Sequence, residues 1–256
     1  DGGYCNSLCN RKIFDYKKMK NYGLIGKSLE HSFSETYFNK KFKKLNLKAC
    51  HYNNYEIKNV SEVKELINKN NLIGLNVTIP FKIEIIKILD KLDKNAEITN
   101  SVNTIKIEKN KLIGYNTDII GFEKSIIPII DKRKNALILG NGGASKSIQH
   151  VLKKLNINFT VISRKDNKNY SNLKKEDIIS HEIIINTTPL GMYPKIDLSP
   201  NILYEFINNK HLAYDLIYNP SETVFLKKAK NNGSKIKNGY EMLKIQADES
   251  WKIWNK

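Results

Sequence analysis

The sequence is poor in acidic residues, and it has no long apolar segment. Its 26 Asp and Glu are outnumbered by 43 Lys and Arg, which gives a formal net charge of +17. No apolar run approaches the roughly 20 residues that a membrane-spanning helix needs. No secretory signal with an apolar centre and a small-residue cleavage site is visible. We therefore expect a cytoplasmic protein without a membrane partner.

Cysteine is also scarce, with only Cys5, Cys9 and Cys50 in the chain. No second Cys/His pair lies near Cys5 and Cys9 to complete a zinc site, so no metal is expected. Residues 1–18 show no clear periodicity and end just before Met19. We interpret them as an upstream extension of the folded protein.

The excess of lysine has two interpretations. A basic patch can bind nucleic acid. Here the lysines are scattered along the whole chain among Asn and Ile, and no nucleic-acid-binding motif accompanies them. We therefore expect no nucleic-acid partner. Salt-sensitive binding of mixed oligonucleotides would support the alternative.

The hydrophobic content of 40% and the length of 256 residues suffice for one large domain or two ordinary ones. Apolar patterns predict alternating strands and helices: strands at 22–26, 50–56 and 75–79, helices at 35–45, 60–69, 82–89 and 96–99, a hairpin at 102–107 and 111–115, a helix at 119–130, strands at 136–139, 159–162, 182–186 and 212–217, and a C-terminal helix from 241. This alternation predicts an α/β fold with a largely parallel sheet.

The stretch LILGNGGASKSIQ is the strongest local signal for a ligand. A strand, a glycine turn and a helix start follow one another, which is the context of a dinucleotide-binding fingerprint. Gly140 would allow the tight turn, and Gly142 would let the backbone approach a pyrophosphate at the helix N-terminus. Ser145 stands at the third glycine place and is still small. A plain strand-to-helix turn is the alternative interpretation.

The end of the next strand indicates which dinucleotide is bound. NAD enzymes usually place an acid there for the ribose hydroxyls, whereas NADP enzymes place cations near the 2′-phosphate. This chain has Ser163, Arg164 and Lys165 at that point. A guanidinium suits a phosphate, so the pattern predicts NADP. The alternative is that Arg164 and Lys165 are ordinary surface cations.

The first half supplies groups suited to hydride transfer at an alcohol. Lys82 is predicted at the start of a helix, where a cation is disfavoured on stability grounds. Asp118 is predicted at another strand-helix junction, as a helix cap or a catalytic residue. A proton carrier and neutral polar groups would suit a polyhydroxylated ligand. The neutral candidates are Ser32, Ser34, Thr78, Asn103 and Thr117.

Several segments resemble the shikimate dehydrogenase family, in the family's order. They are GKSLEHSFSETYFN, NVTIPFK, SVNT, GYNTDIIGF, LGNGGASK, NTTPLGM, DLIYNPSETVFL and NGYEMLKIQA, which together cover the chain from Met19 to Trp254. The resemblance implies two α/β domains flanking a cleft, one of them Rossmann-type. The substrate domain would be residues 19–118 plus 239–256, and the NADP domain residues 119–238. The reaction would be NADPH-dependent reduction of 3-dehydroshikimate to shikimate, by a monomer or homodimer.

The resemblance also implies roles for individual residues. Lys82 would carry the catalytic proton, paired with Asp118, and Ser32 and Ser34 would hold the substrate carboxylate. Ring hydroxyls would be bound by Thr78, Asn103, Asp118 and Gln246, with Tyr218 also facing the substrate. The cofactor-binding residues would be Gly140, Asn141, Gly142, Gly143, Ala144, Ser163, Arg164, Lys165, Thr187, Leu216 and Gly239.

The chain departs from the family pattern in two places. The usual Asn-Arg-Thr is Ser163-Arg164-Lys165, and the usual Gly-Ala before Val-Asn-Thr is Asn100-Ser101. We expect the second change to affect turn packing rather than chemistry. The alternatives are a quinate/shikimate dehydrogenase using NAD, which Arg164 disfavours, and a non-catalytic NADP-binding regulator, which Lys82 and Asp118 disfavour.

Overall fold

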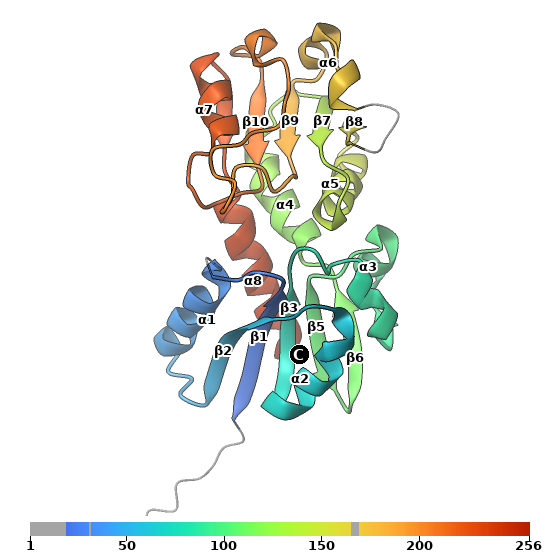
Figure 1. Cartoon of the computed structure of the whole chain (residues 1–256), viewed down its shortest axis with the longest axis vertical. Helices are drawn as coiled ribbons and strands as arrows, with labels where there is room; N and C mark the ends of the chain where they lie inside the picture. The colour runs from blue at the N-terminus through green and yellow to red at the C-terminus, as the bar shows by residue number, and fades with distance from the viewer. Residues whose placement is uncertain (1–18, 31, 165–168) are drawn as a thin grey trace, which may run out of the picture.

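The structure is a computed structural model that describes residues 19–30, 32–164 and 169–256. It forms two lobes stacked along the long axis, each built around its own β-sheet (Figure 1). Helices pack on both sheets, so the predicted α/β fold is confirmed. No helix within the described ranges is long and apolar enough to cross a membrane.

The first sheet is mixed and has the spatial order β2-β1-β3-β5-β6-β4. Its strands are β1 (Lys20–Gly26), β2 (Cys50–Glu56), β3 (Leu72–Val77), β4 (Lys91–Leu92), β5 (Thr104–Glu108) and β6 (Lys111–Tyr115). β1 is parallel to β2 and β3, whereas β5 is antiparallel to β3 and β6. Lys109 and Asn110 both have positive φ, as a tight two-residue hairpin turn requires, and the predicted hairpin is confirmed.

Short helices cover this sheet. They are α1 (Phe33–Lys44), the 3-10 helix η1 (Val60–Glu62), α2 (Val63–Asn70), the 3-10 helix η2 (Glu84–Ile88) and α3 (Lys94–Thr99). Ser32 caps the N-terminus of α1. Lysines in the last turn interact favourably with the negative end of the helix dipole. Separate apolar clusters lie on the two faces of the sheet, around Leu75 and around Tyr22.

The second sheet is entirely parallel, in the order β11-β10-β9-β7-β8. Its strands are β7 (Asn135–Leu139), β8 (Asn158–Ile162), β9 (Ile183–Asn186), β10 (Leu212–Asp215) and β11 (Lys235–Lys237). The helical segments of this lobe are α5 (Gly143–Lys154), η4 (Tyr170–Asn172), α6 (Lys175–Ile179), η5 (Tyr204–Phe206) and α7 (Val224–Asn231). The central strands are buried on both faces, which explains their continuous apolar runs.

Two helices connect the lobes: α4 (Asp118–Ile126), which continues into η3 (Ile127–Ile129), and α8 (Tyr240–Trp254). They pack closely at Gly121, where an added Cβ would lie 2.8 Å from the backbone oxygen of Met242. Met242 belongs to the core of the second sheet, and Trp254 belongs to the core of the first. The indole of Trp254 also donates to the backbone oxygen of Ile105, at 3.0 Å. The helix α8 therefore stabilises both lobes.

The predicted helix at 82–89 is wrong. Lys82 lies in a turn, and only Glu84–Ile88 is helical, as the 3-10 helix η2. The chain must return at once to the sheet edge, where the backbone N–H of Asp90 donates to the oxygen of Leu112 and β4 pairs with β6. These tertiary contacts override the helical spacing of the segment. Lys82 consequently does not oppose a helix dipole.

Candidate active site

An ion pair between Lys82 and Asp118 lies at the junction of the lobes. Lys82 Nζ is 2.6 Å from Asp118 Oδ2, and the two side chains are only 16% and 6% exposed. Lys82 follows β3, and Asp118 is the first residue of α4, where a carboxylate is favoured by the helix dipole. A largely buried pair that keeps a small opening to solvent suits a proton-transfer site.

Asn103 and Gln246 surround this ion pair with amide groups. The Asn103 amide donates to Asp118 Oδ1 at 3.0 Å and to Gln246 Oε1 at 3.2 Å. The backbone N–H of Thr117 donates in turn to Asn103 Oδ1 at 2.8 Å. Gln246 comes from α8, which lies far along the chain. The amide network orients Asp118 and leaves neutral donors and acceptors that suit hydroxyl groups.

Ser32, Ser34 and Tyr218 form a neighbouring group around the start of α1. Ser32 Oγ accepts from the backbone N–H of Ser34 at 3.3 Å, which leaves its O–H available as a donor. The phenol oxygen of Tyr218 accepts from the backbone N–H of Phe33 at 3.3 Å, so the second lobe touches the first here. Burial raises the pKa of Tyr218 above its usual value.

These two groups share one edge of the first sheet. The loop leading to Ser32 follows β1, Thr78 and Lys82 follow β3, and Asp118 follows β6. These three strands point the same way, so their carboxyl ends meet at that edge. Asn103 lies just before the antiparallel strand β5, which starts at the same edge. Ligands of α/β proteins bind at such carboxyl edges.

The predicted phosphate loop follows β7. Gly140 has φ +109°, and a Cβ on it would lie 2.7 Å from Thr187 Oγ1, so a glycine is required there. Among the described residues, Gly142 has no neighbour that an added Cβ would meet within 4 Å, and no side chain caps α5. Helix α5 thus begins at Gly143 and Ala144 with its N–H groups uncapped by a side chain, which suits a bound pyrophosphate.

The remaining candidate residues for the cofactor line the carboxyl edge of the second sheet. The side chain and backbone N–H of Thr187 both donate to the oxygen of Leu139, at 2.8 and 2.9 Å. The backbone N–H of Leu216 donates to the oxygen of Asn186, and a Cβ on Gly239 would lie 2.0 Å from the oxygen of Leu216. Asn141, in the phosphate loop, accepts from Gln149 Nε2 at 3.4 Å.

Arg164 is exposed just beyond β8, next to Ser163, and neither is an acid that would repel a phosphate. β8 is the outer neighbour of β7, so Arg164 flanks the strand that carries the glycine loop. Lys165 lies outside the described residues. The groups at this strand end fit an NADP cofactor better than NAD.

Comparisons with known proteins agree with this geometry. Residues 24–105 match the family model described as shikimate dehydrogenase substrate binding domain. A shikimate dehydrogenase (NADP(+)) of Methanococcus aeolicus is 41% identical, and the alignment covers 93% of this chain and 92% of that protein. The chain belongs to the shikimate dehydrogenase family.

Solved structures of shikimate dehydrogenases share its fold. The enzyme from Aquifex aeolicus is 36% identical, with a TM-score of 0.83 over 93% of each chain. The enzyme from Thermus thermophilus, solved in complex with NADP(H) and shikimate, is 25% identical, with a TM-score of 0.81 over 92% of this chain and 93% of that one. The predicted family and two-domain, Rossmann-type architecture are confirmed.

The sequence reasoning missed two buried polar residues of this family member. Asn116 donates to Ser147 Oγ of α5 at 2.9 Å and to the backbone oxygen of Ser101 at 2.9 Å, and so links the lobes. Asp215 accepts from Asn186 Nδ2, the backbone N–H of Ile217 and Thr223 Oγ1, at 3.1, 3.0 and 2.6 Å. Both residues lie in the motifs that carry the resemblance. Each residue lies at or directly after the end of a strand, and this position was the sequence signal that could have identified them.

Asp215→Asn should make folding stability less sensitive to pH. Burial raises the pKa of Asp215 from 3.8 to about 6, although its three donors lower it. The folded state therefore binds more protons than the unfolded state between these values, and stability falls as pH rises through this window. From pH 4 to 7, the free energy of unfolding of Asp215→Asn should gain about 2 to 3 kcal/mol relative to wild type.

Urea unfolding at several pH values measures this difference. The same substitution at Asp197, an exposed carboxylate in the loop after β9, serves as the matched control and should show no such gain. A stability difference between Asp215→Asn and wild type that stays constant from pH 4 to 7 would contradict the expected cost of burying this charge.

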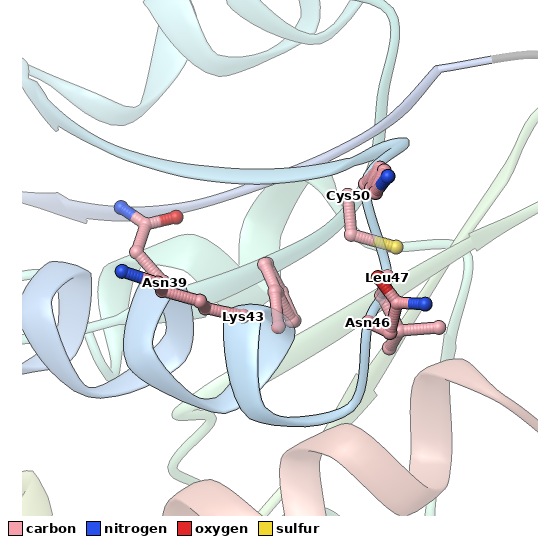
Figure 2. A pocket seen from close by; sticks show the side chains of 7 residues that line it. Asn39, Lys43, Asn46, Leu47 and Cys50 are labelled. Atoms are coloured by element: carbon pink, nitrogen blue, oxygen red, sulfur yellow. The ribbon is translucent and has the colours of Figure 1, made fainter.

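A separate hollow of about 350 Å³ lies between the end of α1 and the start of β2 (Figure 2). Its lining residues are Asn39, Phe42, Lys43, Asn46, Leu47, Lys48 and Cys50. Burial raises the pKa of the Cys50 thiol, which makes it a poor nucleophile. The hollow shares no residue with the candidate active site and is not part of it.

Proposed function

We propose that this chain is an NADP-dependent shikimate dehydrogenase that catalyses the reversible reduction of 3-dehydroshikimate to shikimate. The observation that carries the proposal is the position of the Lys82–Asp118 pair beside the phosphate loop. A Cβ on Gly143, at the start of α5, would lie 3.0 Å from Lys82 Cβ. A proton carrier and a dinucleotide-binding loop are therefore adjacent, as hydride transfer to a carbonyl requires.

When bound, NADPH supplies a hydride to the C3 carbonyl carbon of the substrate. The Lys82 ammonium hydrogen-bonds the carbonyl oxygen, stabilises its developing negative charge and gives it a proton. Together the hydride and the proton convert the ketone to the alcohol, and Lys82 then regains a proton from water. Asp118 holds Lys82 in position through the 2.6 Å contact. In the oxidation direction, Lys82 accepts the hydroxyl proton.

The polar residues around the ion pair would fix the substrate. Ser32 and Ser34 would donate their O–H groups to the substrate carboxylate, and Tyr218 would close this side of the site. Hydroxyl groups of the ring would bind Thr78, Asn103, Asp118 and Gln246. Support comes from the shared sheet edge and from the hydroxyl, amide and carboxylate groups that these side chains provide.

The cofactor would lie along the carboxyl edge of the second sheet. Its pyrophosphate would bind Gly140 to Ala144, and its 2′-phosphate would bind Ser163, Arg164 and Lys165. Thr187, Leu216 and Gly239 would border the nicotinamide end.

We propose the domain division at residues 118/119 and 238/239, a cytoplasmic location and a monomeric or homodimeric state. Light scattering of the purified protein would measure the oligomeric state.

The proposed activity is tested by initial rates at the nicotinamide absorbance band. The purified protein is assayed with shikimate or quinate and with NADP⁺ or NAD⁺. We expect NADP⁺ to be reduced rapidly with shikimate, and the cofactor to be reduced slowly in the other combinations. Comparable rates with quinate and NAD⁺ would assign the chain to a broader-specificity dehydrogenase. Binding of NADP⁺ by folded protein without any turnover would favour a regulatory role.

A further inference from the structure

The hydroxyl of Ser101 is buried without a hydrogen-bond partner. Ser101 is 0% exposed, and its Oγ has no partner among the residues that the structure describes. Its backbone is well paired, because its N–H donates to Ala96 and its oxygen accepts from Asn116 Nδ2 at 2.9 Å. A buried, unpaired hydroxyl is costly, so it calls for an explanation.

This hydroxyl lies beside the N-terminus of α5. A Cβ on Gly143 would lie 2.9 Å from Ser101 Oγ. Since Cα–Cβ bonds in an α-helix tilt toward its N-terminus, that Cβ position lies beside the first turn of α5 and is displaced toward its N-terminal end. Ser101 Oγ therefore borders the place where an anion would bind to this helix.

Surrounding contacts hold Ser101 in this position. Asn116 bonds both the backbone of Ser101 and the side chain of Ser147 in α5, so it fixes the turn to the helix. Asn100 has φ +47°, the left-handed conformation that asparagine tolerates in place of glycine. Asn100 thus provides the left-handed conformation that the turn requires, and the turn does not depend on the Ser101 hydroxyl.

We propose that Ser101 is a further cofactor-binding residue, whose O–H donates to a pyrophosphate oxygen of the dinucleotide at the N-terminus of α5. The inference rests on the proposed function, which places the dinucleotide there. It is an alternative to the expectation that the Asn100-Ser101 departure affects turn packing rather than chemistry. Because Ser101 is 0% exposed, this donation requires the first turn of α5 to move away from Ser101 when the dinucleotide binds. The unpaired hydroxyl then gains its missing partner.

The variant Ser101→Ala tests this proposal, with the free energy of unfolding and cofactor affinity measured separately. Calorimetric titration of NADP⁺ should give a Kd roughly tenfold weaker than that of wild type, the loss of one charge-assisted hydrogen bond. Urea unfolding of the ligand-free variant should show a midpoint equal to or above that of wild type, because no pairing is lost. A purely structural hydroxyl would not produce this combination.

Ser125→Ala is the matched control, because Ser125 is also buried but is fully paired. Its hydroxyl bonds Tyr214 at 2.7 Å and the oxygen of Phe122 at 3.0 Å, away from the phosphate loop. Its variant should unfold at lower urea and keep the wild-type Kd for NADP⁺.

Only a weaker Kd together with an unfolding midpoint no lower than that of wild type supports the role of Ser101, and every other result for Ser101→Ala overturns it. Wild-type protein that does not bind NADP⁺ would overturn the proposed function itself, and the inference with it. Wild-type binding with an unchanged Kd in Ser101→Ala would overturn the inference alone.

Discussion

Lys82→Ala should lower kcat by about 10² to 10⁴-fold, the range for losing a general acid–base group. The variant keeps the phosphate loop and the Asn103–Asp118 hydrogen bond, so its Kd for NADP⁺ should stay near the wild-type value. Initial rates with shikimate and NADP⁺ measure kcat, and cofactor titration measures Kd. The substitution leaves the Asp118 carboxylate without its cationic partner. Thermal unfolding therefore measures whether the variant is destabilised.

Lys87→Ala provides the matched control for this experiment. Lys87 lies on η2, five residues after Lys82 and outside the candidate active site. Its variant should turn over at the wild-type rate. Near-normal kcat in a folded Lys82→Ala protein would show that another group carries the proton.

Arg164→Ala should weaken the binding of NADP⁺ by about 10- to 100-fold while leaving that of NAD⁺ almost unchanged. Arg164 is exposed, and in the proposed site its guanidinium pairs with the 2′-phosphate, which only NADP⁺ carries. NAD⁺ is therefore the internal control within one variant. The measurement is the ratio of kcat/KM for the two cofactors, compared between wild type and Arg164→Ala.

An equal loss of kcat/KM with both cofactors would contradict this role for Arg164. It would mean that the residue supports the loop rather than the phosphate. Raising the salt concentration should also weaken NADP⁺ binding more in wild type than in the variant, because an exposed charge contact is screened.

The parallel half of the fold could be predicted from sequence because each signal there was local. β7 is a short apolar run followed at once by Gly140 and an amphipathic helix, and the structure has all three elements in place. The prediction for residues 82–89 was wrong because the helical spacing there is a local signal. The pairing of β4 with β6, which limits the helical part to Glu84–Ile88, is a long-range contact that the spacing does not show.

The candidate site could be predicted only in part. Lys82, Asp118 and Gln246 lie far apart in the chain, and the resemblance to the family, rather than any spacing, brought them together. Asn116 was missed as an interacting residue because one of its partners, Ser147, belongs to the other lobe. A polar residue that bonds across an interface looks in sequence like any other loop residue.

A single-turnover experiment tests the central claim most directly. Wild-type protein preloaded with NADP⁺ is mixed rapidly with shikimate, and the nicotinamide absorbance is followed at protein concentrations above that of the cofactor. We expect a fast rise that converts the bound NADP⁺ to NADPH, and a rise slower by orders of magnitude in Lys82→Ala. Saturating binding of both ligands to the wild-type protein with no absorbance change would contradict the proposal that this site transfers hydride.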